Sequence, residues 1–477
     1  MRKFKKKFLL AGVAAFAVAA TNFSATALSL NEAVMIAVDS NPEIGQAIAN
    51  REAVEFELRQ ALGLYLPRVS LEGSTGIRRL DNPSRRFSGI EDDALYPSQV
   101  GVVVTYDIWD GGYRKSEANR QAARVDGASF RVLERSEFIG LEIARQYFQV
   151  LLQQRVVRIA RENVGFHQQT NNNVRDAIAS RQLTAADRQQ ANERLGQARA
   201  RLTEAEEALS SADIAFNALV AVPLTNASMP PRVTAGALPG DLASAIGTAR
   251  VNNPRIKMAS ADVDAAAAVI EQSRSGRKPK LSFEGRATTG YDINGTDGAT
   301  HDVEARLALT WSIFDGGIKK AEVQENIRRE TETRLAGQQA YREVEEAVRV
   351  SWDRMHRQAQ LARQYGDQLV ASTQLVNSYR EQFTVNQRSL LDVLDAQNTR
   401  FNVQVLSETA HFSQRYAEYR LLAATGGLLA YLSVEAPHQA EAYARSQLNS
   451  PSADSYQPRK RTPVNFNTPV DLTKFVN

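Results

Sequence analysis

The chain contains two copies of one pattern, and this internal duplication limits its fold more than any other feature. Residues 67–73 read PRVSLEG and residues 279–285 read PKLSFEG, an offset of about 212 residues. Further along, YDIWDGGYRKSEA at 106–118 matches WSIFDGGIKKAEV at 311–323, at an offset of about 205 residues. Length changes between repeats usually fall in loops. We therefore expect both copies to contain the same elements in the same order.

The N-terminus has the three parts of a secretory signal. A basic region is followed by an apolar stretch over 8–20 and by Ala-Thr-Ala at 25–27, which fits an A-x-A cleavage site. The alternative, an anchoring helix, is disfavoured because the apolar stretch is too short to span a bilayer. We predict that residues 1–27 are a signal peptide.

Charge and composition exclude several classes of function. Of the 58 Lys and Arg, five lie in 1–27, which leaves 53 against 54 acidic residues. This balance argues against a nucleic-acid-binding surface. The absence of cysteine excludes thiolate catalysis and cysteine-zinc sites, and no H-E-x-x-H, P-loop or G-x-S-x-G motif occurs. We predict no enzymatic activity, no cofactor and no metal site.

Four segments alternate apolar and polar residues, as strands do. They are 68–77, 99–109, 281–291 and 303–314. Each has the length of about ten residues that a tilted membrane strand needs, although periodicity alone also allows a sheet that covers a soluble core. No segment after the signal reaches 18 consecutive apolar residues, so a membrane form requires a closed barrel. Four strands cannot close one, and we therefore expect the chain to oligomerise.

Long proline-free runs follow both D-G-G sequences. Ala, Gln, Arg, Glu and Leu dominate them, as in coiled coils. We expect helices that end near Ala179 and Thr384, each about 100 Å long at 1.5 Å per residue, and return helices over about 184–220 and 389–431. Helices of this length need partner surfaces, because intrinsic propensity does not stabilise them alone.

The duplication divides the chain into four parts. Residues 1–27 are the signal peptide, and 28–235 are a first repeat of short helices, two strands and a long helical hairpin. Residues 236–433 repeat the same plan. Residues 434–477 are rich in Pro, Ser, Asn and Gln, which predicts a disordered or loosely attached tail.

Together these features resemble the TolC-like outer-membrane efflux proteins over residues 29–432. The similarity rests on the duplication, the D-G-G step and the sequence LDVLDAQ at 391–397. It implies an all-α plus membrane β-barrel fold, in which a homotrimer forms a 12-stranded barrel in the outer-membrane lipid and a 12-helix periplasmic α-barrel. It also implies passive export of drugs or secreted proteins, as in type I secretion. The implied partners are a periplasmic adaptor (membrane fusion) protein and an inner-membrane RND or ABC transporter.

The resemblance also assigns roles near the hairpin ends. Asp392 and Asp395 share a helix face, and the resemblance places them in a carboxylate ring at the periplasmic entrance. Spacing alone fits acids that complement the helix dipole. Arg388 and Asp187 match the family's gate latch, whose alternative is an exposed ion pair of little energy. Phe383 occupies the position of the family's usual tyrosine, so the latch is expected to differ here.

Two further sets of residues complete the expected sites. The resemblance implies that an adaptor docks at the hairpin ends, at Arg181, Thr184, Asn386 and Ser389. Glycine permits a change of chain direction between strand and helix, and this interpretation is favoured over a phosphate cradle. These pivots are Gly111, Gly112, Gly316 and Gly317.

Two other classes of protein were weighed against an export channel. A structural coiled-coil protein of the cell envelope, without a conduit, explains the long helices but not the amphipathic strands before each. A secreted hydrolase has no supporting group of catalytic residues. The sequence does not distinguish drugs from proteins as cargo, nor does it identify the pump.

Overall fold

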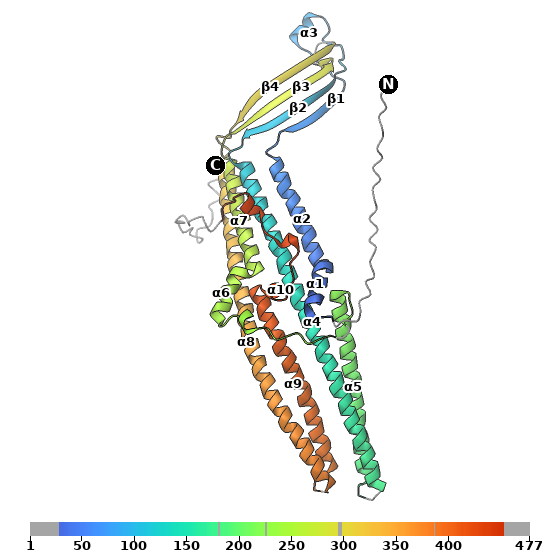
Figure 1. Ribbon diagram of the computed structural model, residues 1–477. Coiled ribbons are helices and arrows are strands. Elements are labelled where there is room, and N and C mark those ends of the chain that lie inside the picture. Colours follow the sequence, from blue (N-terminus) through green and yellow to red (C-terminus); the bar gives the residue numbers. More distant parts are fainter. Residues whose placement is uncertain (1–27, 180–181, 225–226, 294–297, 386, 453–477) are drawn as a thin grey trace, which may run out of the picture.

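The computed structural model describes residues 28–179, 182–224, 227–293, 298–385 and 387–452 (Figure 1). The expected signal peptide, 1–27, lies outside the described residues. The strands gather at one end of an elongated molecule, and two helical hairpins end at the other. In chain order the elements are α1 (Leu30–Ser40), α2 (Pro42–Gly63), β1 (Arg68–Thr75), α3 (Pro83–Phe87), β2 (Ser98–Trp109), α4 (Tyr113–Ala179), α5 (Ala185–Val220), η1 (Ala235–Ala237), α6 (Leu242–Asn252), α7 (Pro254–Ser275), β3 (Lys280–Tyr291), β4 (Ala299–Thr310), α8 (Ile318–Thr384), α9 (Leu390–Thr425), α10 (Leu428–Tyr431), η3 (His438–Ala440) and α11 (Ala444–Gln447).

The repeated plan predicted from the sequence is confirmed. Helices α4 and α8 each have 67 residues, and the return helices α5 and α9 each have 36. The predicted end of the second return helix, residue 431, is wrong. Helix α9 ends at Thr425 because Gly426 follows in a left-handed conformation (φ 76°) that suits glycine.

Equivalent asparagines attach the short helices to the hairpins. The side chain of Asn41 accepts a hydrogen bond from the backbone N–H of Glu43 (2.9 Å) and caps α2, whose first residue is Pro42. Asn253 caps α7 in the same way. Each asparagine also donates its Nδ2 to a carbonyl near the end of a return helix, Leu219 (3.5 Å) or Ala424 (3.0 Å). The duplicated Asn-Pro pairs therefore make the same contact between a short helix and a return helix in each repeat.

The D-G-G sequences form the step from strand to long helix. All four glycines have positive φ, between 67° and 100°, which L-residues rarely adopt. Asp110 accepts hydrogen bonds from the N–H groups of Gly112 (3.0 Å) and Arg114 (2.9 Å). Asp315 does the same for Gly317 (3.0 Å) and Lys319 (3.1 Å). The aspartates thus satisfy first-turn donors that the helix leaves free.

The four strands form one antiparallel sheet in the order β1-β2-β3-β4. Three of the expected strands agree with the structure within a few residues, but the fourth, expected over 303–314, begins and ends four residues earlier. Thr310 pairs with Lys280, the first residue of β3. Beyond it the chain has no partner on that strand, and the indole N–H of Trp311 donates to the carbonyl of Arg277 instead (3.2 Å).

The sheet has one apolar face and one charged face. Direct partners across an antiparallel pair share a face, as do residues two apart along a strand. The register therefore places on one side Leu71, Val102, Val104, Phe283, Leu307 and Leu309. The opposite face carries ion pairs between strands, among them Arg286–Glu72 (3.4 Å) and Lys280–Asp107 (3.0 Å). Within the described part of the chain, no helix covers either face (Figure 1).

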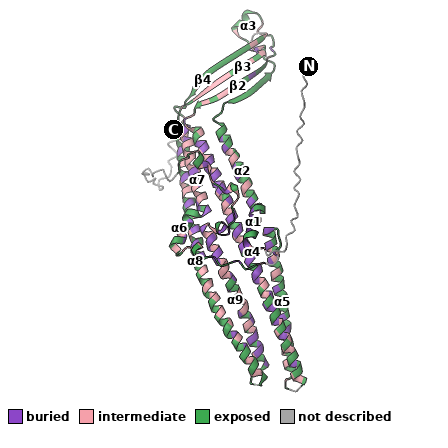
Figure 2. Cartoon of the chain, viewed as in Figure 1, coloured by how far each residue is buried: buried purple, intermediate pink, exposed green. Residues whose placement is uncertain are grey.

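The main core lies in the middle of the helical part. Figure 2 shows buried residues along α4 and largely exposed strands. The fully buried side chains of the main core include Tyr147 of α4, Phe216 of α5 and Tyr419 of α9, so the core joins these three helices. The Tyr147 hydroxyl oxygen lies 2.8 Å from the carbonyl oxygens of both Leu28 and Ser228, which share its single proton. Among the described residues, no helix is both long and apolar enough to cross a bilayer.

The C-terminal segment 434–452 is packed against the helices, which corrects the expectation of a loose tail from residue 434. Val434 joins the main core, and Ala444 is fully buried beside α2 and α4. Arg445 donates its Nε to Asp126 of α4 (2.8 Å) and also pairs with Asp264 of α7. Composition misled here because a few buried contacts and a paired arginine hold the segment. Residues 453–477 lie outside the described residues.

Candidate functional site

Both hairpins turn with the same capping device. Thr184 caps α5: the Asp187 carboxylate accepts from its N–H (2.8 Å) and hydroxyl (2.7 Å), and the N–H of Asp187 donates back to Thr184 Oγ1 (3.4 Å). Ser389 and Asp392 form the equivalent capping box on α9. The acids here satisfy N-terminal donors and complement the helix dipole. Arg181 and Asn386, expected at the same ends, lie outside the described residues.

The expected latch is not assembled within one chain. Arg388 Nε donates to Gln382 Oε1 (2.9 Å), its guanidinium lies 4.5 Å from the ring centre of Tyr379, and Nη1 is 4.0 Å from Asp392 Oδ2. Among the described residues, no hydrogen bond or ion pair joins Arg388 to Asp187. Arg388 is thus held inside its own hairpin.

Phe383, the third residue of the expected latch, makes apolar contacts and donates no hydrogen bond from its side chain. It lies against a small apolar cluster formed at the hairpin ends by Val174, Ala191, Leu390 and Leu394. A phenyl ring has no hydroxyl, so its contribution at this position is apolar contact between the two hairpins.

A different ion pair joins the hairpins. Arg194 Nη2 of α5 donates to Asp395 Oδ1 of α9 at 3.0 Å. One helical turn before Asp395, Asp392 is engaged in its capping box. Both carboxylates stay accessible, with side-chain exposures of 57% for Asp395 and 41% for Asp392. The two predicted ring acids therefore differ: one caps a helix and the other is partly neutralised.

Further polar contacts continue this junction away from the ends. Arg201 Nη1 donates to Asn398 Oδ1 (2.7 Å) and lies 3.4 Å from Asn402 Oδ1. Gln397 Nε2 donates to Asn163 Oδ1 of α4 (2.9 Å) in a buried position. Because charge-assisted hydrogen bonds are stronger than neutral ones, the arginines are the main polar links between α5 and α9.

Sequence reasoning missed Arg194 and Arg201. The sequence did contain a signal for this contact. Arg194 and Arg201 are seven residues apart, and their partners on α9, Asp395 and Asn402, have the same spacing. Equal seven-residue spacing brings side chains to the facing sides of two parallel coiled helices. The spacing alone does not give the relative register of α5 and α9, so the pairing required the structure.

His167 lies beside this junction on α4. Its side chain is buried, and burial lowers its pKa to about 4, with the charges of Arg194 and Arg201 acting in the same direction. The imidazole is therefore neutral above about pH 5. It adds no third positive charge to the arginines that contact α9.

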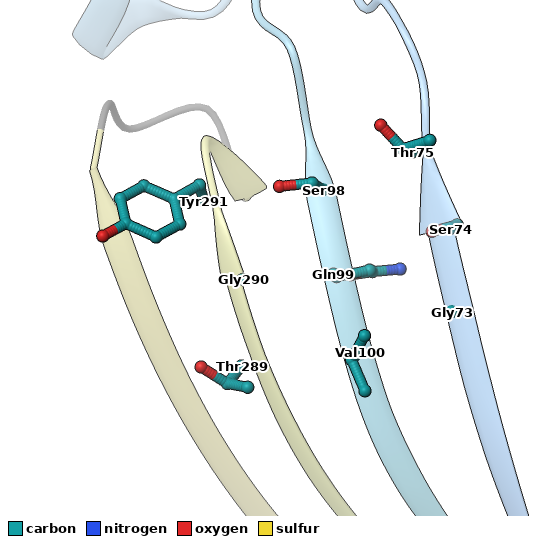
Figure 3. Close-up of a pocket in the computed structure, with 9 residues that line it drawn as sticks. All are labelled: Gly73, Ser74, Thr75, Ser98, Gln99, Val100, Thr289, Gly290 and Tyr291. Carbon is teal, nitrogen blue, oxygen red and sulfur yellow. The ribbon is translucent and has the colours of Figure 1, made fainter.

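The described residues can be compared with the geometry of a metal site and of an enclosed active site. No group of three His, Asp or Glu is placed to hold a metal ion among the described residues. A hollow of about 560 Å³ at the far end of the sheet (Figure 3) is lined by neutral groups: Gly73, Ser74, Thr75, Ser98, Gln99, Val100, Thr289, Gly290 and Tyr291. Without a general base or an activated nucleophile, this hollow does not form an active site.

Comparisons with known proteins identify relatives over most of the chain. The family described as "Outer membrane efflux protein" matches residues 34–222 and 245–427. The outer membrane efflux protein BepC of Brucella suis is 21% identical over 430 residues, which cover 89% of this chain and 91% of BepC.

Solved structures share the fold at low sequence identity. A membrane protein from Pseudomonas aeruginosa superposes with a TM-score of 0.74 at 19% identity, covering 83% of this chain and 90% of that one. The outer membrane protein VceC of Vibrio cholerae gives a TM-score of 0.72 at 14% identity, covering 83% and 96%. At these identities the likeness establishes the architecture only.

Proposed function

Because this chain belongs to the outer membrane efflux protein family, we propose that three copies of it form a passive export conduit across the outer membrane and the periplasm. The observation that carries the proposal is the sheet: one apolar face, one charged face, and no helical cover on either. In a barrel, such a sheet turns its apolar face to lipid and its charged face to a water-filled lumen.

The edges of the sheet support assembly from several copies. Strands β1 and β4 are its two edges, and unpaired edge groups are not tolerated in lipid. Pairing β4 of one copy with β1 of the next satisfies both edges. Three copies of four strands give a 12-stranded barrel, an even number within the known range. The same symmetry gathers the four long helices of each copy into a 12-helix periplasmic tube.

The hairpin ends are proposed to form the closed entrance of this tube. Asp392 and Asp395, tripled by symmetry, would place six carboxylates around the opening, a charge pattern that attracts cations and repels anions. Arg194 holds Asp395 against the first hairpin. We infer that this contact contributes to the closed state, and that Arg388 can reach Asp187 only between copies or in another conformation.

The proposed partners follow from the family and the location of the ends. The hairpin ends lie about 100 Å from the sheet, at 1.5 Å per residue for a 67-residue helix. They are the part of the chain that can reach a periplasmic adaptor and an inner-membrane RND or ABC transporter. The cargo, drugs or secreted proteins, is then selected by that transporter.

The adaptor contact is tested by cross-linking. A photoreactive residue at Thr184 or Ser389, both at hairpin ends, is expected to cross-link to a periplasmic adaptor in intact cells. The same residue within α6 or at the start of α7 is expected to give no adaptor product. Adaptor products confined to positions 240–275 would place the docking surface elsewhere.

The membrane face of the sheet is tested by thiol labelling, since the natural chain has no cysteine. Single cysteines at Leu71, Val102 or Leu307 are expected to react at least about tenfold more slowly with a water-soluble maleimide than cysteines at Glu72 or Glu284, because lipid excludes the reagent. Glu72 is adjacent to Leu71 on β1 and is its matched control, and Glu284 on β3 reports the opposite face of the sheet. Equal rates on both faces would reject the proposed orientation of the sheet.

A further inference from the structure

Four cations lie near the two steps between the strands and the long helices; three of them are exposed, and Lys319 is half-buried. Lys115 lies in the first turn of α4, Arg277 precedes β3, and Lys319 and Lys320 begin α8. No ion pair is formed by any of the four among the described residues. We call these four residues the step cations.

The two repeats differ at this point. Arg114 of the first copy is paired with Asp110 (Nε to Oδ2, 2.9 Å), and both side chains are largely buried. Lys319 occupies the equivalent position in the second copy, where the Asp315 carboxylate receives only backbone N–H groups. The duplication therefore produced one internal ion pair and one half-buried lysine that forms no ion pair among the described residues.

Exposed apolar side chains lie next to the step cations. Trp311 and Ile313 continue the alternation of the apolar face beyond the end of β4. The side chains of Trp311 and Phe314 are 55% and 88% exposed, and Ile318 begins α8 in an equally open position. Aromatic residues flanked by lysine are typical of the boundary between hydrocarbon and headgroups.

We propose that the strand-to-helix step binds the phosphate headgroups of anionic phospholipid, with the step cations as the binding groups. The inference rests on the proposed membrane function, and it adds the chemistry of one lipid class. Charge complementarity favours this partner: none of the step cations forms an ion pair among the described residues, and three of the four are exposed. Glu322 is the exposed carboxylate nearest to Lys319 in the chain. A wholly apolar partner would leave these cations desolvated and unpaired, which is costly.

Native mass spectrometry of the purified full-length protein tests the proposal, with phosphatidylglycerol and phosphatidylcholine as probes. The wild type is expected to retain phosphatidylglycerol in preference to phosphatidylcholine. Replacing two cations, in the variant Lys319→Gln with Lys320→Gln, is expected to weaken phosphatidylglycerol retention about thirtyfold, given the strength of each lysine near an anionic surface. High salt should weaken wild-type retention as well.

A matched control uses the same helix and the same charge change. Arg342 and Arg363 are exposed residues of α8 without an ion pair among the described residues, and they lie far along the helix from the step. Arg342→Gln with Arg363→Gln is expected to retain phosphatidylglycerol as the wild type does. An equal loss in both double variants would show a general charge effect and overturn the assignment.

The remaining outcomes separate the lipid site from the conduit. If Lys319→Gln with Lys320→Gln keeps its phosphatidylglycerol preference while the protein still conducts ions, the lipid inference fails and the conduit stands. If the variant instead dissociates into single chains without a change in lipid preference, the step is a contact between copies, and the inference fails. A wild type that neither conducts nor retains any lipid rejects both.

Discussion

Truncation after Glu435 is expected to lower the free energy of unfolding by about 3–5 kcal/mol, the usual cost of removing one partner from a buried ion pair. The cut removes Arg445, which contacts the buried carboxylates of Asp126 and Asp264. It also removes Ala444, whose N–H donates to Asp126 (2.8 Å). We expect denaturation at lower urea concentration and loss of the proposed trimers, which heat-modified migration on gels would report.

Three further variants test whether the loss of stability comes from the Arg445 contacts or from shortening the chain in general. Truncation after Ser452 keeps every described contact of the segment, and it is expected to unfold like the full chain. Arg445→Gln alone should reproduce most of the loss. Adding Asp126→Asn and Asp264→Asn to Arg445→Gln should recover part of it, because the uncompensated charges are then gone. Equal unfolding midpoints for the chain cut after Glu435 and the full chain would contradict the role of this segment.

Replacing Asp392 and Asp395 with alanine is expected to abolish the cation preference of the conduit and its block by multivalent cations. In the proposed trimer, six carboxylates would surround a narrow opening and concentrate cations. Their removal should raise the half-blocking concentration of a trivalent cation at least about tenfold, or about 1.4 kcal/mol. Block is measured from currents in planar bilayers. The pair Asp392→Asn with Asp395→Asn removes the charge but keeps side-chain hydrogen bonding, and it should behave alike.

The arginines at the junction provide the second arm of this experiment. Arg194→Ser releases Asp395 from the first hairpin, so the resting conductance should rise and multivalent block should strengthen. Arg388→Ser is expected to have the smaller effect, because its guanidinium is held by Gln382 and Tyr379 of its own hairpin. If the double alanine variant keeps both its cation preference and its block, these acids do not line the constriction.

Much of the fold could be predicted because duplicated local signals agree with one another. The D-G-G sequence marked both steps from strand to helix, since glycine adopts the positive φ that each step requires. The Asn-Pro pairs marked the short-helix joints, and alternation gave the correct side of the sheet for Leu71 and Phe283. Each of these signals depends on neighbouring residues only.

The errors occurred where distant contacts decide the structure. The fourth strand continued its alternation through Ile313, but it ends at Thr310 because its partner strand begins at Lys280. The segment after residue 434 has a polar composition, and its place depends on Asp126 and Asp264, which lie far away in the chain. Alternation and composition describe only the segment itself and carry no information about such partners.

The candidate site was predicted in part. The sequence and the family resemblance placed Asp392 and Asp395 near the end of the second hairpin, where the structure has both on α9. They did not give the partner of Asp395, because the register between α5 and α9 sets the Arg194 contact. Arg388 and Asp187 were expected to meet, yet each is engaged within its own hairpin. The latch between Arg388 and Asp187 stays a prediction.

The central claim, that this chain forms an ion-conducting passage rather than a structural coiled coil, is tested most directly by planar-bilayer recording of the purified full-length protein. An export conduit should give stable, discrete conductance steps that are small at rest, cation-selective and reduced by trivalent cations. A protein that inserts into no bilayer, or that inserts without conducting, would contradict the claim.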